Sequence, residues 1–290
     1  MTQQLEIPHN LASAATDGRG DWLRALPEVI KDVAGRWSLS VGPPFQPGGS
    51  TAWVSPARRQ DGSEVVLKVA MSHPEADHEA DGLRLWNGDG AVLLFDVAKF
   101  NDTTALLLER CVPATMLAHR PAGEQDHVVS GLLRRLWRVP PAGHPFRPLA
   151  EMCATWADQF DERVRTQPSA VDAGLVREGI GLFRSLPQCA ARDVVLVTDL
   201  HAENILASHR EPWLVIDPKP HVGDPTYDVL QHMLTSTEPL HGDPRGFVQR
   251  MADLAELDHE RLALWLFARC VQESLDWPAL GSVAARLAPC

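Results

Sequence analysis

The sequence predicts an α+β fold in two parts, a small lobe built on an antiparallel sheet and a larger lobe made mainly of helices. Short extended runs separated by turn residues fill most of the first 110 residues, and helical periodicity dominates afterwards. The character of the sequence changes near Pro113, so we expect an N-terminal lobe over residues 1–110 and a C-terminal lobe over residues 111–290. With 290 residues, of which 44% are hydrophobic, the chain is long enough for two such units.

The first lobe is expected to open with an amphipathic helix over residues 21–34, where apolar side chains recur at helical spacing. A second helix should begin with Pro74 in its first turn and end at Asn87-Gly88. Asp61-Gly62 indicates a hairpin turn, and Pro47–Ser50 indicates a loop. Five short extended runs are predicted as strands: 37–41, 51–55, 64–70, 92–98 and 104–109.

The second lobe combines long helical segments with three short strands. The helices are expected over residues 126–137, 149–164 and 172–186, and again from about Pro225 to the end. The strands are expected at 194–197, 205–207 and 213–216. A cleft between two such lobes is a common place for a ligand.

Composition and charge exclude several classes of protein. The net charge of −11 argues against nucleic-acid binding, which needs a basic surface, and is compatible with a cationic small molecule. The five cysteines are widely spread and form no C-x-x-C pair, which is typical of a reducing compartment. The sequence has neither a signal-peptide pattern nor an apolar run of membrane-spanning length. We therefore expect a cytoplasmic protein without a membrane partner, whose oligomeric state the sequence does not indicate.

The most informative residues are Asp199, Asn204 and Asp217. The strands at 205–207 and 213–216 should form an antiparallel hairpin, which brings Asn204 and Asp217 side by side at its open end. An amide oxygen beside a carboxylate suits Mg²⁺, which prefers oxygen ligands and leaves room for phosphate. Asp199 lies on the loop just before the hairpin, where its carboxylate can meet an attacking hydroxyl.

This arrangement resembles the catalytic core of kinases, in which a D-x-x-x-x-N loop precedes a hairpin and a metal-binding Asp. More narrowly, D-L-H-x-x-N, W-L-x-I-D-P-K-P and G-D-P-x-Y-D within residues 194–228 resemble the aminoglycoside phosphotransferase family. The branch is that of the streptomycin 6-phosphotransferases and hydroxyurea phosphotransferases, and the resemblance extends from about Trp37 onward. It implies a protein-kinase-like fold with Asp199 as catalytic base, Asn204 and Asp217 as Mg²⁺ ligands, and ATP or GTP as phosphoryl donor.

One departure from the family pattern lies beside the expected base. The family usually reads H-G-D-L-H, whereas this chain has Val197 and Thr198 before Asp199. A β-branched residue in place of glycine would be expected to reshape the catalytic loop. Two alternatives to an active kinase follow from the residues: a kinase-like nucleotide-binding protein with impaired catalysis, and a metallophosphoesterase built on Asp199 and His201. The second would need further Asp, Asn and His ligands, which the sequence does not cluster.

Lys68 and Glu79 are the candidates for the nucleotide-binding ion pair. Lys68 stands in the apolar run 65–70, where it must reach solvent or find a partner. Glu79 lies on the apolar stripe of the following helix, beside Ala76 and Leu83, so it should face the sheet. The pair resembles the strand-lysine and helix-glutamate pair of kinases, in which the lysine contacts the α- and β-phosphates. The alternative is an edge-strand lysine that reaches solvent.

Two backbone segments complete the expected nucleotide site. Gly48, Gly49 and Ser50 lie between the first two strands, where kinases place the loop that covers the phosphates. A plain hairpin turn is the alternative for this loop. The residues from Glu109 to Cys111 match the connector between the lobes, whose backbone would hydrogen-bond adenine.

The acceptor side is expected among the C-terminal helices. Glu273 continues a partly apolar helix stripe, and Asp276 and Trp277 lie just beyond it. A carboxylate beside an aromatic ring suits an ammonium or guanidinium group, so these three residues are predicted to line or border the acceptor pocket. The site residues predict an O-phosphotransferase that uses ATP and Mg²⁺. The family resemblance implies that its acceptor is a hydroxylated antibiotic, an aminoglycoside such as streptomycin or another such as a nucleoside, and that phosphorylation confers resistance by inactivation.

Overall fold

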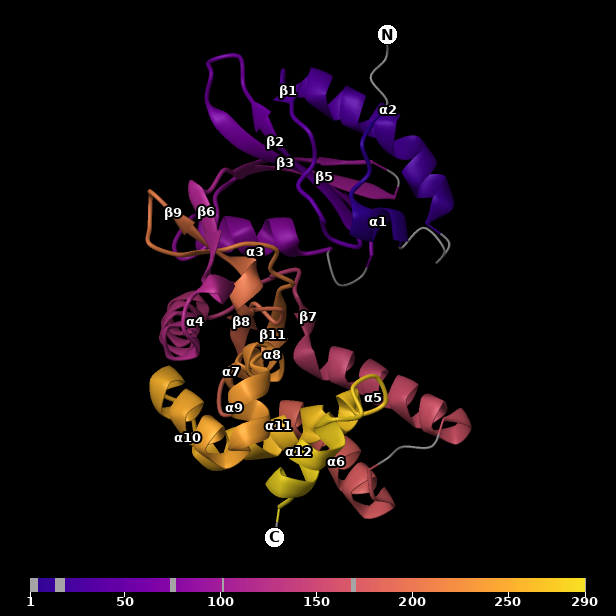
Figure 1. The fold of residues 1–290 in the computed structure, drawn as a ribbon, viewed down its shortest axis with the longest axis vertical. Helices are drawn as coiled ribbons and strands as arrows, with labels where there is room; N and C mark the ends of the chain where they lie inside the picture. The colour runs from indigo at the N-terminus through magenta and orange to yellow at the C-terminus, as the bar shows by residue number, and fades with distance from the viewer. Residues whose placement is uncertain (1–4, 14–18, 74–76, 101, 168–170, 290) are drawn as a thin grey trace. The chain divides into compact units, whose positions relative to one another are not determined.

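The computed structural model describes residues 5–13, 19–73, 77–100, 102–167 and 171–289. These residues form two compact units, whose elements are labelled in Figure 1. The first unit contains the described residues up to Ala114 together with Ser208–Arg210, and the second contains the remainder. No helix in the described part of the chain is both long and apolar enough to cross a bilayer.

The first unit is a five-stranded antiparallel sheet in the order β1-β2-β3-β5-β4, accompanied by three helices. The pairing follows the expected hairpins, with Val54 opposite Lys68 and Lys68 opposite Leu106. The elements of this unit are α1 (His9–Ser13), α2 (Gly20–Arg36), β1 (Ser40–Val41), β2 (Ala52–Arg58), β3 (Glu64–Met71), α3 (Glu79–Trp86), β4 (Leu94–Lys99) and β5 (Thr103–Glu109).

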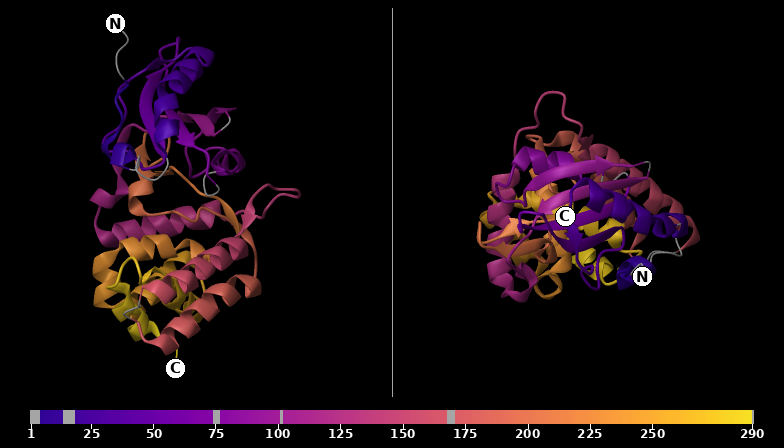
Figure 2. Two further views of the ribbon diagram at one scale, coloured as in Figure 1. Left: turned by 90° about the vertical axis from the view of Figure 1, so that its right-hand side faces the viewer. Right: turned by 90° about the horizontal axis from the view of Figure 1, so that it is seen from above.

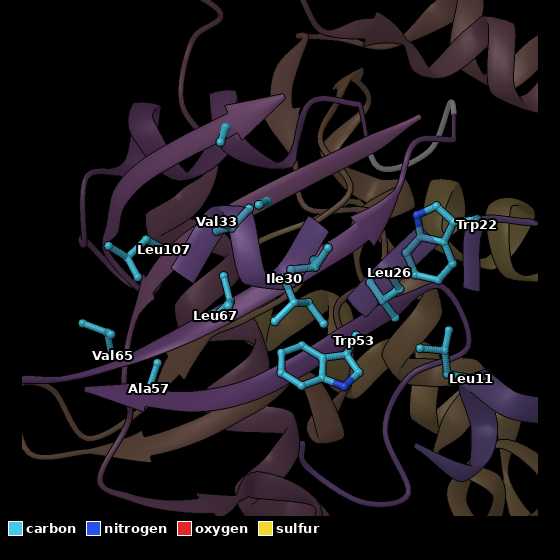
Figure 3. Packing of buried hydrophobic residues seen from close by; sticks show 13 residues of the cluster. Leu11, Trp22, Leu26, Ile30, Val33, Trp53, Ala57, Val65, Leu67 and Leu107 are labelled. Carbon is cyan, nitrogen blue, oxygen red and sulfur yellow. The ribbon is translucent and has the colours of Figure 1, made fainter. Parts of the chain in front are cut away.

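One face of this sheet is covered by α2. Leu26, Ile30 and Val33 on the helix are buried in the same cluster as Leu67 on β3 (Figure 3). Burying a side chain of this kind contributes about 1.5–3 kcal/mol. Because successive strand residues point to opposite faces, Lys68 is directed away from α2 and toward the other side of the sheet.

Several predicted boundaries in this unit need correction, and among them the strand expected over 51–55 extends to Arg58 and the one expected over 92–98 begins at Leu94. The first strand was expected over residues 37–41 and occupies only Ser40–Val41, because Ser38 takes a left-handed conformation with a φ of 53°. The second helix begins at Glu79, after turn residues 77–78, whereas the predicted start at Pro74 lies outside the described residues. Its end is as predicted, since Asn87 caps it in the left-handed conformation.

The second unit is mainly helical, with short strands between the helices. Its strands form two three-stranded sheets, in the orders β10-β9-β6 and β7-β11-β8. The strands are β6 (Pro113–Met116), which begins in the first unit, β7 (Arg147–Pro148), β8 (Val194–Leu196), β9 (Ile205–Ser208), β10 (Leu214–Val215) and β11 (His221–Gly223). The helices are η2 (Leu117–His119), α4 (Ala122–Leu136), α5 (Leu149–Thr166), α6 (Ala173–Ser185), η3 (Leu186–Cys189), η4 (Ala202–Asn204), α7 (Pro225–Asp228), α8 (Leu230–Thr235), α9 (Thr237–Gly242), α10 (Pro244–Ala255), α11 (His259–Glu273) and α12 (Leu280–Leu287).

The core of the second unit is organised around α11. This helix packs against α6, α10 and α12. In Figure 2 the C-terminal helices of this unit, coloured orange to yellow, are gathered beside the salmon helices that precede them in the chain. Trp265 and Phe267 at its centre are fully buried. The helices predicted at 149–164 and 172–186 are confirmed as α5 and α6, while α4 begins four residues before its predicted start.

Candidate active site

Lys68 and Glu79 form a buried ion pair in the first unit. The Lys68 Nζ donates to both carboxylate oxygens of Glu79, at 2.7 and 2.6 Å. Only 6% of Lys68 and 3% of Glu79 is exposed. The pairing predicted from the sequence is confirmed, and the alternative of a solvent-reaching edge lysine is wrong because β3 is the middle strand of the sheet.

The loop that contains Gly48, Gly49 and Ser50 is tied to the N-terminal residues. The backbone N–H of Asn10 donates to the Pro47 carbonyl at 3.1 Å, and its side-chain amide donates to the Gly48 carbonyl at 2.8 Å. Gly48 has a φ of +75°, and a Cβ there would lie 2.5 Å from the Cβ of Pro8. This position therefore requires glycine. Gly49 and Ser50 are exposed.

The connector residues Glu109 and Cys111 lie at the end of β5 and just after it. The Glu109 carboxylate accepts two hydrogen bonds from the Arg210 guanidinium, both at 2.8 Å, and one from the Leu93 N–H at 3.0 Å. Arg210 also donates to the carbonyls of Gly88 and Ala91, which explains why the tip of the β9–β10 hairpin belongs to the first unit.

In this connector Cys111 can bind a ligand through its backbone N–H and does not provide a reactive thiol. Its side chain is buried, and this burial raises the pKa of the thiol to about 11, so it stays protonated at neutral pH. Within the described residues, the Cys111 N–H makes no hydrogen bond to the protein. The backbone of this segment therefore has a donor available to a ligand.

Asn204 and Asp217 lie together at the open end of the β9–β10 hairpin. Val215 is opposite Ile205 in the ladder, and the N–H of Ile216 donates to the Asn204 carbonyl at 2.9 Å. The Asn204 side-chain nitrogen donates to the backbone carbonyl of Asp199 at 3.0 Å, which leaves the amide oxygen as the atom for a metal. An amide oxygen beside a carboxylate fits Mg²⁺.

A buried carboxylate holds the loop that precedes Asp199. Asp228 accepts the N–H groups of Val197 at 3.0 Å and Thr198 at 2.6 Å, and the indole N–H of Trp137 at 2.9 Å. Burial raises the pKa of Asp228 to about 6, although these three donors favour its ionised form. Asp228 therefore ties down the loop before Asp199, whereas the sequence suggests a structural role for it at the loop after Asp217.

Thr198 takes the conformation that glycine would take. Its φ is +58°, and its hydroxyl donates to the Lys219 carbonyl at 2.5 Å. A β-branched residue is strained in this region of the φ/ψ map. The expectation that Thr198 reshapes the loop stays a prediction, and in the structure its side chain fastens the loop to the segment after Asp217.

A lysine that the sequence analysis did not single out contacts the expected base. The Lys219 Nζ donates to the Asp199 Oδ2 at 2.5 Å, and the two side chains are 30% and 21% exposed. The only signal in the sequence is its place two residues after Asp217, in the motif I-D-P-K-P.

A cavity of about 320 Å³ borders the same loop within the second unit. His201 and Glu203 from the segment after Asp199 line this cavity, and so does Glu238 from α9. The described lining includes two carboxylates and no lysine or arginine: Ala118, Ala122, Gln125, His201, Ala202, Glu203, Thr235, Ser236, Thr237, Glu238 and Pro239. Such a lining favours a cationic ligand.

The three residues predicted to border the acceptor pocket lie elsewhere in the second unit. Glu273 pairs with the buried Arg269 at 2.6 Å, and Asp276 forms two hydrogen bonds with Arg163. Trp277 is 49% exposed. None of the three predicted residues lines the cavity beside His201.

The two units together define a class of protein. A small antiparallel sheet with a buried lysine–glutamate pair, followed by a helical unit with a D-x-x-x-x-N loop and a hairpin aspartate, is the protein-kinase-like phosphotransferase fold. Solved structures agree with this assignment. Choline kinase LicA from Streptococcus pneumoniae matches with a TM-score of 0.58 at 17% identity, over 90% of this chain and 95% of that one. Macrolide 2′-phosphotransferase MphH from Brachybacterium faecium matches with a TM-score of 0.57 at 15% identity, over 91% and 98%.

The chain belongs to the aminoglycoside/hydroxyurea antibiotic resistance kinase family, whose model matches residues 36–281. Streptomycin 6-kinase from Streptomyces griseus is 35% identical over 94% of this chain and 91% of that protein. Hydroxyurea phosphotransferase from Kitasatospora aureofaciens is 34% identical over 97% of this chain and 82% of that protein. The predicted fold and family are confirmed, and the chain is a kinase, which implies ATP as its phosphoryl donor.

The alternative of a metallophosphoesterase is not favoured. In the part of the chain that the structure describes, no group of three or more His, Cys, Asp or Glu side chains gathers in a way that would hold a metal ion. Impaired catalysis is not favoured either, because the chain belongs to a family of kinases and its relatives are named as kinases or phosphotransferases.

Proposed function

We propose that this kinase transfers the γ-phosphoryl group of ATP to a hydroxyl of a small cationic antibiotic, of which streptomycin is the leading candidate, and so inactivates the antibiotic in the cytoplasm. The observation that carries the proposal is the joint placement of Asp199, Asn204 and Asp217 on one loop and hairpin, beside a cavity with an acidic lining. The chain's family supports the reaction, and the lining supports the charge of the acceptor.

In this proposal Asp199 accepts the proton of the acceptor hydroxyl as its oxygen attacks the γ-phosphorus. Asn204 and Asp217 would hold Mg²⁺, which when bound neutralises charge on the phosphates. Catalysis then depends mostly on positioning and electrostatics, since phosphoryl transfer needs little covalent help from the protein.

The nucleotide contacts are assigned to the first unit. Lys68, held by Glu79, would contact the α- and β-phosphates. The backbone of Gly48, Gly49 and Ser50 would lie over the phosphates, and the backbone from Glu109 to Cys111 would bind adenine. The available Cys111 N–H and the tethered glycine loop support these roles.

The cavity beside His201 is the proposed acceptor site. Glu203 and Glu238 offer ion pairs to an ammonium or guanidinium group, and streptomycin carries two guanidinium groups whereas hydroxyurea is neutral. The acceptor role of Glu273, Asp276 and Trp277 stays a prediction, and in the structure the two carboxylates already have arginine partners.

The test is a transfer assay with Mg²⁺ and ATP against streptomycin, hydroxyurea and a macrolide, read by mass spectrometry as the addition of one phosphoryl group. We expect transfer to streptomycin. Glu238→Gln should raise the KM for streptomycin roughly tenfold, the loss of one charge-assisted contact, and leave the KM for ATP unchanged. Glu162→Gln, at an exposed site on α5, is the matched control. A preference for hydroxyurea, or a Glu238→Gln enzyme with an unchanged KM for streptomycin, would refute the cationic acceptor.

A further inference from the structure

The ion pair between Lys219 and Asp199 differs from an ordinary surface pair. The Asp199 carboxylate has one hydrogen-bond partner among the described residues, and this partner is the Lys219 Nζ at 2.5 Å from Oδ2. Both side chains are mostly buried, with 30% and 21% exposed. Contacts of this kind lose less to solvent screening than fully exposed pairs, whose net contribution is small.

Hydrogen bonds join the backbone of Lys219 to the residues just before Asp199. The Lys219 N–H donates to the Val197 carbonyl at 3.0 Å. The Lys219 carbonyl accepts from the Thr198 hydroxyl at 2.5 Å and is 2.9 Å from the Nδ1 of His221. The residue that carries the ammonium group is therefore joined to the two residues that precede Asp199.

This arrangement orients the carboxylate. With Oδ2 held by the ammonium group, Oδ1 is the oxygen left for an incoming hydroxyl. A base that rotates freely about its side-chain torsions would lose this orientation, and a misplacement of about 1 Å at a reacting group can cost about 10²-fold in rate.

We infer that Lys219 is a positioning residue for phosphoryl transfer, one that holds Oδ2 of Asp199 so that Oδ1 meets the acceptor hydroxyl. The inference rests on the proposed function, in which Asp199 is the base. As the acceptor oxygen bonds to the γ-phosphorus, the bond from that phosphorus to the β,γ-bridging oxygen breaks and ADP leaves. The hydroxyl proton passes to Asp199, and Lys219 keeps its own protons throughout.

The test compares Lys219→Met and Lys219→Arg with the wild-type enzyme, using whichever of streptomycin and hydroxyurea the wild-type enzyme phosphorylates. We expect Lys219→Met to lower kcat by about 10- to 100-fold, with both KM values within about threefold of wild type. Lys219→Arg keeps a cation at this position, so its decrease in log kcat should be smaller than that of Lys219→Met by at least about a third. Arg184→Met, which breaks two surface ion pairs between α6 and α5, is the matched control and should leave kcat unchanged.

A double-mutant cycle separates positioning from a general loss of structure. If Lys219 acts through Asp199, Lys219→Met should change kcat by less than about twofold in an Asp199→Asn enzyme. Equal losses in both backgrounds, or a Lys219→Met enzyme with wild-type kcat, would overturn the inference. An Asp199→Asn enzyme with wild-type turnover would instead refute the assignment of the base, so the two failures are distinguishable.

Discussion

Neutralising Glu79 is expected to separate the structural and the catalytic roles of the Lys68–Glu79 pair. Glu79→Gln keeps the shape of the side chain and removes its charge, so the buried Lys68 ammonium group loses the carboxylate to which it donates two hydrogen bonds. The two side chains are 8% and 4% exposed, so water cannot replace the lost contact.

The expected loss follows from this burial. Breaking a buried ion pair by removal of one partner costs about 3–5 kcal/mol, and the retained amide oxygen should reduce the loss to about 3 kcal/mol. Equilibrium unfolding in urea measures this loss as a fall in the unfolding free energy. Because Lys68 would lose its fixed position, the KM for ATP should also rise by about tenfold or more.

A double variant tests the reasoning. Lys68→Met with Glu79→Leu removes both charges and replaces them with apolar groups, so the unfolding free energy should return to within about 1 kcal/mol of wild type. Phosphoryl transfer should not return, because the lysine proposed to contact the α- and β-phosphates is absent. If the double variant phosphorylates with a wild-type KM for ATP, Lys68 is a structural residue and the nucleotide role assigned to it is wrong.

Three further predictions concern the loops. Thr198→Gly should keep kcat within about threefold of wild type. Relief of the backbone strain at a φ of +58° and loss of the hydrogen bond to Lys219 are each worth about 1 kcal/mol and should offset each other. A larger loss of kcat in steady-state kinetics would contradict this prediction. Asn10→Ala should raise the KM for ATP about threefold with kcat unchanged, since the side-chain hydrogen bond from Asn10 to the Gly48 carbonyl stabilises the loop by about 1 kcal/mol. An unaltered KM for ATP would show that the loop does not contact the nucleotide. Activity should fall below about pH 6, because protonated Asp228 accepts less well from its N–H donors. The contribution of Asp228 to the unfolding free energy should instead rise from pH 6 toward pH 4, because its pKa is raised from 3.8 to about 6 in the native state. Activity and unfolding free energy that change with pH in the same direction would contradict this prediction.

Much of the fold could be predicted from the sequence because its signals are local. The apolar run 65–70 that contains Lys68 and the apolar helix stripe that includes Glu79 indicate which face each side chain takes, and together they predict the ion pair. The hairpin between Asn204 and Asp217 was predictable for the same reason, since an antiparallel turn returns the chain to its starting point. The strand at 37–41 was overestimated because no pattern in the sequence marks Ser38 as left-handed.

The rest of the site depends on contacts between distant segments. Arg210 and Lys219 look like ordinary loop residues in the sequence, and only the folded chain shows that one binds Glu109 and the other Asp199. The cavity beside His201 joins residues near 120, 202 and 237, which no periodicity connects. Glu273 and Asp276 continue a helical pattern that predicts an acceptor pocket, and in the structure they pair with Arg269 and Arg163.

The most direct test of the central claim is the turnover and nucleotide binding of Asp199→Asn, measured on the same preparation. With Asp199 as the base, kcat for the antibiotic acceptor should fall by at least about 10²-fold, while calorimetry with Mg²⁺ and ATP should give the wild-type dissociation constant. Turnover at the wild-type rate would contradict the account, because a carboxylate that can be neutralised without loss is not the group that accepts the acceptor's proton.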